Sequence, residues 1–109
     1  MSTVQKILFT KHARQDLLET YEFIRDTDSL RAAKRVMKKI ETACLSLSEN
    51  PERGHVPKEL RAIDVTGWLE IIVSPWRIIY TIREDALHII GILDGRRDIP
   101  TILMGRLLR

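Results

Sequence analysis

The chain has 109 residues, a formal net charge of +3 at pH 7 and 44% hydrophobic residues. This size predicts one domain, residues 1–109, with a core that needs no disulfide or metal in order to fold. The single cysteine, Cys44, cannot form an internal disulfide, no apolar run approaches the roughly 18 residues of a membrane span, and no signal peptide is evident. We therefore expect a cytoplasmic protein with no membrane partner.

The first half of the chain has helical periodicity. A short extended segment at residues 6–9 precedes Thr10, which is a plausible N-cap. The apolar residues that follow recur at helical spacing: Ala13, Leu17, Tyr21 and Ile24. Short polar residues then end this helix, and Asp28 or Ser29 can cap a second one. We expect a helical hairpin over about residues 11–48.

The second helix has two distinct faces. Its apolar stripe predicts burial against the rest of the domain and consists of Ala33, Val36, Met37, Ile40, Cys44 and Leu47. Its positive face consists of Arg31, Lys34, Arg35, Lys38 and Lys39. The positive face is either an ordinary solvated surface or a docking surface for an acidic segment or a nucleic acid backbone.

The period of the sequence changes after residues 49–57, where two prolines, a glycine and an asparagine exclude continued helix. We expect a strand at residues 60–65 and a firmer one at 68–73. Two isoleucine-rich runs around the turn Glu84-Asp85 then predict a hairpin at the centre of the sheet.

The layout of these segments predicts an α+β fold, in which a helical hairpin packs on a small, mainly antiparallel sheet over about residues 60–95. The connections after Gly67 are too short for parallel crossovers. A short last helix is expected over about residues 100–108.

The second half of the chain carries the candidate site. No lysine follows Lys58, and arginine binds phosphate or carboxylate with a planar fork but is a poor proton shuttle. Strand alternation places Arg77 and Arg83 on one face of the sheet. Glu70, on the preceding strand, either pairs with Arg77 or leaves it free to face a ligand.

Arg96 and Arg97 follow the turn dipeptide Asp94-Gly95. Two interpretations are open for these arginines. They form local ion pairs with the flanking aspartates, or they bind phosphate oxygens at the end of a strand. We expect Arg77, Arg96 and Arg97 to cluster along an exposed rim of the sheet.

Metal, nucleotide and nucleophile motifs are absent from the sequence. The histidines at positions 12, 55 and 88 have no partner at metal-ligand spacing, and the glycines form no phosphate loop. Packing is the expected role of His88 and simple exposure that of His55. We expect no cofactor and no metal.

At these residues the chain resembles the RelE/ParE toxins of type II toxin–antitoxin systems, also called plasmid stabilisation proteins. The strand motifs that carry the resemblance are Trp-Arg-Ile-Ile-Tyr-Thr-Ile at residues 76–82 and Ile-Ile-Gly-Ile-Leu-Asp-Gly-Arg-Arg-Asp at residues 89–98. The likeness continues upstream at residues 13–17, Asn50-Pro51, Gly54 and residues 57–61.

The resemblance implies two helices on a small antiparallel sheet and a cognate antitoxin whose C-terminal segment wraps the toxin. RelE-like members cut mRNA at the ribosomal A site, whereas ParE-like members inhibit DNA gyrase. Arg77 and Arg97 match arginines of the cutting branch, and only in that case would they be catalytic. The residues expected to bind the target or a phosphate are Arg61, Arg77, Arg83, Arg96 and Arg97. The candidate bases or pairing acids are Glu59 and Glu70.

Two departures from the cutting branch favour the ParE-like interpretation. The cutting type species has lysines on the strand before the arginine, whereas Glu70 is the only charge at residues 68–72 here. It also has a tyrosine in its last helix, and none stands near Leu103. We therefore expect a toxin that inhibits gyrase and is not an enzyme, and we retain a ribosome-dependent mRNA endoribonuclease as the alternative.

Overall fold

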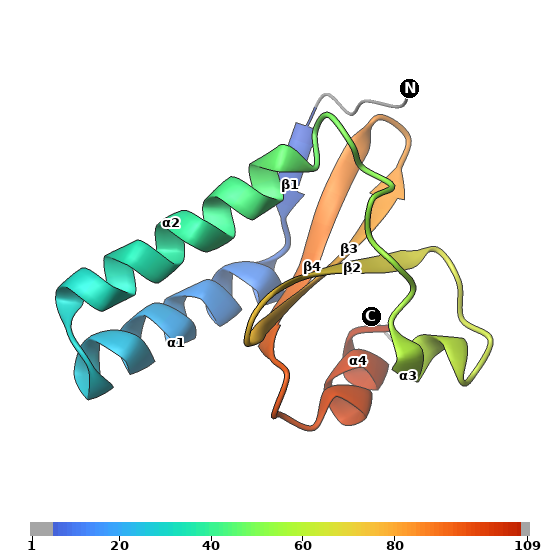
Figure 1. The fold of residues 1–109 in the computed structure, drawn as a ribbon. Coiled ribbons are helices and arrows are strands. Elements are labelled where there is room, and N and C mark those ends of the chain that lie inside the picture. The colour runs from blue at the N-terminus through green and yellow to red at the C-terminus, as the bar shows by residue number, and fades with distance from the viewer. Residues whose placement is uncertain (1–5, 108–109) are drawn as a thin grey trace.

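A four-stranded sheet carries a long helical hairpin on one face and two shorter helices on the other (Figure 1). The computed structural model describes residues 6–107. In chain order the elements are β1 (Lys6–Phe9), α1 (Lys11–Thr27), α2 (Leu30–Ser46), α3 (Lys58–Arg61), β2 (Trp68–Val73), β3 (Trp76–Arg83), β4 (Ala86–Asp94) and α4 (Ile99–Leu107). The predicted α+β fold is confirmed.

The strands lie in the order β1-β4-β3-β2. The strands β2, β3 and β4 are antiparallel neighbours, as the short connections predicted. The first strand pairs in parallel with β4, from Lys6 opposite Ala86 to Phe9 opposite Ile89. The sheet is therefore mixed, and β1 forms one of its edges.

A capping residue precedes each helix of the hairpin. The hydroxyl of Thr10 accepts a hydrogen bond from the N–H of Ala13 at 3.1 Å, and that of Ser29 accepts one from Ala32 at 3.0 Å. Of the two candidate caps for α2, Ser29 is the one used, because Asp28 ends α1 instead. The apolar stripe of α2 faces the sheet, and burial raises the pKa of the Cys44 thiol to about 12.

The prediction of a strand at residues 60–65 is wrong. Residues 58–61 form the short helix α3, and a turn follows it. Pro57 stands just before this helix with a φ of −55°, which is compatible with a helix start. Only Leu60 is fully buried in this segment, so its side chain acts as a single anchor and there is no alternating buried face for a strand to present.

Strand β3 separates two cores by alternation, as its sequence predicted. Ile78 and Tyr80 face the helical hairpin, whereas Ile79 packs with Leu60 and Leu103 under α3 and α4. The pairing with β4 is interrupted once, because Ile79 lies opposite Gly91 while Tyr80 lies opposite Ile89. The residue between them on β4, at position 90, is thus the extra residue of a β-bulge.

A buried ion pair closes the edge of β4 beyond the end of β1. The carboxylate of Asp16 on α1 accepts from both terminal nitrogens of Arg106 on α4, at 2.7 and 2.9 Å. It also accepts from the backbone N–H of Ile92 at 2.9 Å, and Arg106 donates to the carbonyl of Ile90 at 3.1 Å. A Cβ atom at Gly91 would lie 2.6 Å from the Arg106 guanidinium, so this approach needs glycine.

None of the helices within residues 6–107 is long and apolar enough to cross a membrane.

Replacing Asp16 by Ala should destabilise the fold strongly. The side chains of Asp16 and Arg106 are only 4% and 10% exposed, and removing one partner of a buried pair costs about 3–5 kcal/mol. Urea unfolding measures the free energy of unfolding. The matched control is Asp26→Ala, which breaks the exposed Arg25–Asp26 pair and should leave that free energy nearly unchanged. Equal losses in the two variants would contradict this role for Asp16.

Candidate functional site

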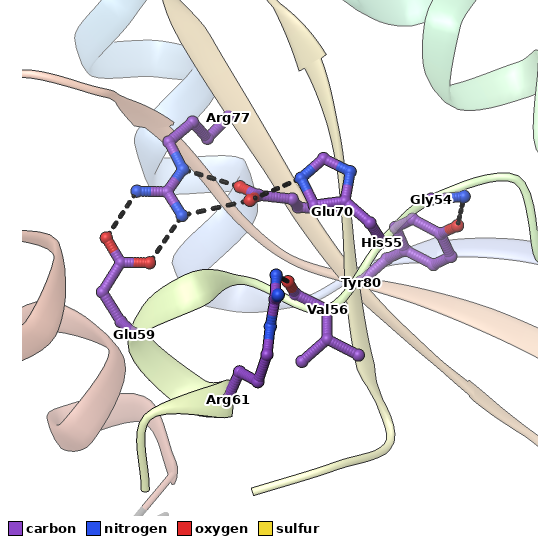
Figure 2. A network of polar contacts seen from close by, with 8 residues as sticks. All are labelled: Gly54, His55, Val56, Glu59, Arg61, Glu70, Arg77 and Tyr80. Atoms are coloured by element: carbon purple, nitrogen blue, oxygen red, sulfur yellow. Dashed lines mark hydrogen bonds and ion pairs between the residues drawn. The ribbon is translucent and has the colours of Figure 1, made fainter. Parts of the chain in front are cut away.

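Arg77 is held between two carboxylates inside the protein (Figure 2). Its Nε donates to Glu70 Oε1 at 2.6 Å, and its Nη1 and Nη2 donate to the two oxygens of Glu59 at 2.8 and 2.7 Å. A further bond of 3.2 Å joins Nη2 to Glu70 Oε2. The side chains of Arg77, Glu59 and Glu70 are 11%, 13% and 4% exposed. We call these three residues the Arg77 clamp.

The Arg77 clamp joins three elements that are separate in sequence. Arg77 lies near the start of β3, where its strand partner on β2 is Ile72. Glu70 stands two residues from that partner, so it is a diagonal neighbour on the same face of the sheet. Glu59 comes from α3, which lies over this face (Figure 1). The side chain of Glu59 reaches Arg77 because this segment is a helical turn.

The loop before α3 is pinned to the same region by Tyr80 and His55. The Tyr80 hydroxyl donates to the carbonyl of Pro51 at 2.7 Å and accepts from the N–H of Gly54 at 3.0 Å. The backbones of His55 and Glu70 exchange hydrogen bonds of 3.0 and 2.7 Å. The ring of His55 also lies 3.0 Å from Glu70 Oε2 (Figure 2). The loop is therefore held by Tyr80 just before His55 and by Glu70 at His55 itself.

The opposite charges of Arg77 and Glu59 each stabilise the ionised form of the other. Hydrogen bonding to Glu59, with a smaller contribution from Glu70, raises the pKa of Arg77 above its ordinary value although burial opposes this. The same hydrogen bonds lower the pKa of Glu59. Two carboxylates around one guanidinium give the cluster a formal charge of −1 at neutral pH. A second anion, such as a phosphate, would be repelled at this point.

The clamp leaves Arg77 little capacity to bind a ligand. A guanidinium has five N–H groups, and four bonds from Arg77 go to Glu59 and Glu70. Glu59 is correspondingly a poor proton acceptor, because its pKa is lowered. The sequence left open whether Arg77 pairs with Glu70 or faces a ligand, and in the structure it pairs with Glu70 and with Glu59.

Arg96 and Arg97 form an exposed corner after β4. Arg96 donates to both carboxylate oxygens of Asp94, at 3.0 and 2.7 Å, which is the local pair that the sequence allowed. Arg97 is exposed, and within residues 6–107 its side chain has no hydrogen bond or ion pair. Both arginines line a hollow of about 260 Å³ together with Phe23 and Trp76. We call these four residues the arginine corner.

The structure does not gather the five predicted arginines into one site. Arg96 and Arg97 alone remain together on the surface. Arg61 is exposed on α3 and donates to the carbonyl of Val56 at 3.3 Å (Figure 2). Arg83 is exposed at the far end of β3 from Arg77, about 20 Å away at 3.3 Å per residue. The expected rim of Arg77, Arg96 and Arg97 thus holds only its last two members.

Sequence reasoning missed the pair of Asp16 with Arg106. A signal was present, since Asp16 falls on the apolar stripe of α1, where a charged residue needs a buried partner. The partner itself, 90 residues away, could not be inferred. Within residues 6–107 no three histidine, cysteine, aspartate or glutamate side chains gather as metal ligands would.

Replacing Arg77 by Met should destabilise the fold by about 3–5 kcal/mol, because it leaves two buried carboxylates without their cation. Chemical unfolding would measure the loss. The triple variant R77M/E59Q/E70Q removes the stranded charges as well and should recover part of the stability. Arg97→Met is the control for loss of an exposed arginine. A clamp that contributed nothing would make Arg77→Met and Arg97→Met equivalent.

The clamp should also make stability depend on acid pH. Arg77 lowers the pKa of Glu59 in the folded state, so the stabilisation is complete above the unfolded value of about 4.3 and is lost as the pH falls through the lower folded value. Unfolding followed between pH 6 and pH 3 should therefore show a shallower decline in Glu59→Gln than in the parent. Parallel declines would show that Glu59 does not contribute.

Three comparisons with known proteins agree with this fold. The model of the family described as the ParE toxin of the type II toxin–antitoxin system parDE matches residues 7–99. Toxin ParE3 of Caulobacter vibrioides is 24% identical over 98 residues, which cover 90% of this chain and 94% of that protein. A solved structure of the chromosomal ParDE system from P. aeruginosa superposes with a TM-score of 0.70 at 17% identity, over 84% of this chain and 96% of that chain.

The family match spans most of the chain, from β1 to the first residue of α4. It confirms the resemblance to the RelE/ParE toxins that the strand motifs indicated, and it identifies the branch. This chain belongs to the ParE toxins of type II toxin–antitoxin systems.

Proposed function

We propose that this protein arrests growth by binding DNA gyrase, without cutting RNA, and that the C-terminal segment of its cognate antitoxin wraps and neutralises it. Membership of the family implies the antitoxin as a partner. The gyrase target and the wrapping segment are the proposal. Gyrase acts on DNA in the cytoplasm, so the proposal places the toxin there.

The Arg77 clamp is the observation that carries this choice of target. Cleavage by a 2′-hydroxyl needs a base, an acid and a cation for the charge that develops on the phosphate. Arg77 is one of the two arginines that match the cutting branch, and its charge is neutralised by Glu59 and Glu70. Releasing Arg77 toward a phosphate would leave these two carboxylates unpaired in a largely buried site. This energetic cost supports a function that does not depend on Arg77 as a catalyst.

The arginine corner is the surface that we assign to the target. Phe23 is 63% exposed although it is a large apolar residue, and Trp76 lines the same hollow. Exposed aromatic residues beside an arginine are the composition of interface hot spots. Arg97 adds an exposed cation that makes no ion pair within the described residues.

A different surface suits the antitoxin. An apolar hollow of about 290 Å³ lies between the helical hairpin and β1, and its lining includes Leu17, Met37 and Leu45. Leu45 is exposed beside this region, and β1 is an edge strand with an unpaired outer side. An extended or helical segment with apolar side chains can cover these residues, and the cations of α2 can pair with its acids.

The proposal predicts that the purified toxin inhibits supercoiling by gyrase. Replacing both Arg96 and Arg97 by Ala should weaken inhibition about tenfold or more, because losing a hot-spot arginine costs 1–2 kcal/mol or more. Lys39→Ala, on the exposed face of α2, removes a cation elsewhere and should inhibit like the parent. The readout is the toxin concentration that halves supercoiling of a relaxed plasmid.

A parallel assay separates the two targets. Ribosomes translating a defined messenger are incubated with the toxin, and the messenger is mapped for new 5′ ends. Intact messenger with blocked supercoiling supports the proposal. Normal supercoiling at micromolar toxin would sink it, and cleavage within the ribosomal A site that is lost in Arg77→Ala would establish the RNA-cutting alternative.

A further inference from the structure

One hollow on the sheet has cations and an aromatic ring in its wall but, among residues 6–107, no carboxylate. It has a volume of about 230 Å³ and lies on the part of the sheet nearest the β3–β4 turn. Its polar and aromatic lining consists of Thr10, His12, Trp68, Thr81, Arg83, His88 and Arg106. The hollow at the arginine corner differs, because Asp16, Glu19 and Asp94 line it as well.

The register of the strands builds this hollow. Trp68 on β2 lies opposite Thr81 on β3, and Thr81 lies opposite His88 on β4. These three residues form a row across the sheet with their side chains on one face. Arg83 stands two residues beyond Thr81 and so projects to the same face. His12 joins the wall from the first turn of α1.

The free charge in the hollow belongs to Arg83. Arg106 also lines the wall, but its guanidinium is already bound to Asp16 and to the carbonyl of Ile90. Arg83 is exposed and makes no ion pair within residues 6–107. His12 and His88 each add ring N–H donors. The hollow therefore presents one unneutralised guanidinium and two imidazoles to a ligand.

We propose that this hollow binds a nucleoside monophosphate. The phosphate accepts hydrogen bonds from Arg83, His12 and His88, because a guanidinium fork suits phosphate oxygens. The base stacks on the ring of Trp68, since every base has a flat face that an aromatic side chain can cover. The chain has no glycine-rich phosphate loop, so side chains alone supply the donors.

A second hollow adjoins the first. It has a volume of about 580 Å³ and shares Arg83 and His88 with the first. Glu84 and Asp85, at the β3–β4 turn, line this second hollow, so the phosphate belongs in the first. The proposal goes beyond the proposed inhibition of gyrase and does not depend on it, because the residues of the arginine corner do not line either hollow.

The test is a titration of the full-length protein with adenosine 5′-monophosphate, followed by calorimetry and by NMR of the two tryptophan indole N–H signals. We expect saturable binding in which the Trp68 signal shifts and the Trp76 signal does not, because Trp76 lies at the arginine corner. Adenosine and inorganic phosphate, tested alone, should each bind at least tenfold more weakly. Arg83→Gln and His88→Gln should each weaken binding of the nucleotide at least tenfold.

Arg61→Gln is the matched control, since Arg61 is also exposed but lies on α3 outside this hollow. It should bind the nucleotide like the parent. Thermal unfolding of each variant shows whether it is folded, and the wild-type NMR signals test the site without any substitution. Absence of binding, inorganic phosphate binding as tightly as the nucleotide, or a shift of both indoles would each overturn the proposal. Tighter binding of a 5′-phosphorylated single-stranded oligonucleotide would replace the free nucleotide by a nucleic acid strand.

Discussion

The ion pairs of Arg77 with Glu59 and Glu70 are the constraint on which the rest of the site depends. Helix α3 has only four residues, so it has few backbone bonds of its own, and a helix of that length is not stable in isolation. The Glu59–Arg77 bonds and the burial of Leu60 attach α3 to the sheet. The same bonds neutralise the charge of Arg77, the arginine of the β3 motif that matches an arginine of the RNA-cutting branch. The Arg77 clamp thus stabilises the fold and, by the same contacts, keeps Arg77 from acting as a catalytic cation.

A second buried ion pair holds α4 in a similar way. Asp16 and Arg106 join α1 to α4 across the bulge in β4, where Ile90 and Ile92 have backbone groups that no strand pairs. Each short helix is therefore held by a carboxylate–guanidinium pair as well as by apolar contacts, α3 to the sheet and α4 to α1. Which arginines remain available to a partner is decided by the fold, because Arg77 and Arg106 are held in buried pairs whereas Arg83, Arg96 and Arg97 are exposed.

Much of this fold could be predicted from the sequence because its main elements have clear periods. The helical hairpin follows from apolar spacing and from caps at Thr10 and Ser29, and the two faces of β3 follow from alternation. The bulge at Ile90 could not be predicted, since the isoleucine run around it is equally compatible with regular pairing. The partner of Arg77 was predicted only in part. Glu70 lies on a neighbouring strand and was recognisable, whereas Glu59 immediately precedes residues 60–65, which were expected to form a strand. The conformation of that segment depends on the burial of Leu60 against the rest of the protein.

The residue at position 70 on β2 therefore has a large influence on which ligands this face of the sheet can bind. Glu70 lies diagonal to Arg77 on the same face, so its charge determines whether the guanidinium turns inward or stays available. A lysine there, as on the corresponding strand of the cutting type species that the motifs resemble, would repel Arg77 and would itself be attracted to a phosphate. The acid draws the arginine into the protein and makes this part of the face anionic. At the far end of β3 no carboxylate stands beside Arg83 within the hollow that it shares with Trp68 and His88. The face is thus divided along β3 into an anionic end at the Arg77 clamp and an end at Arg83 whose cation, unpaired within residues 6–107, can attract an anion.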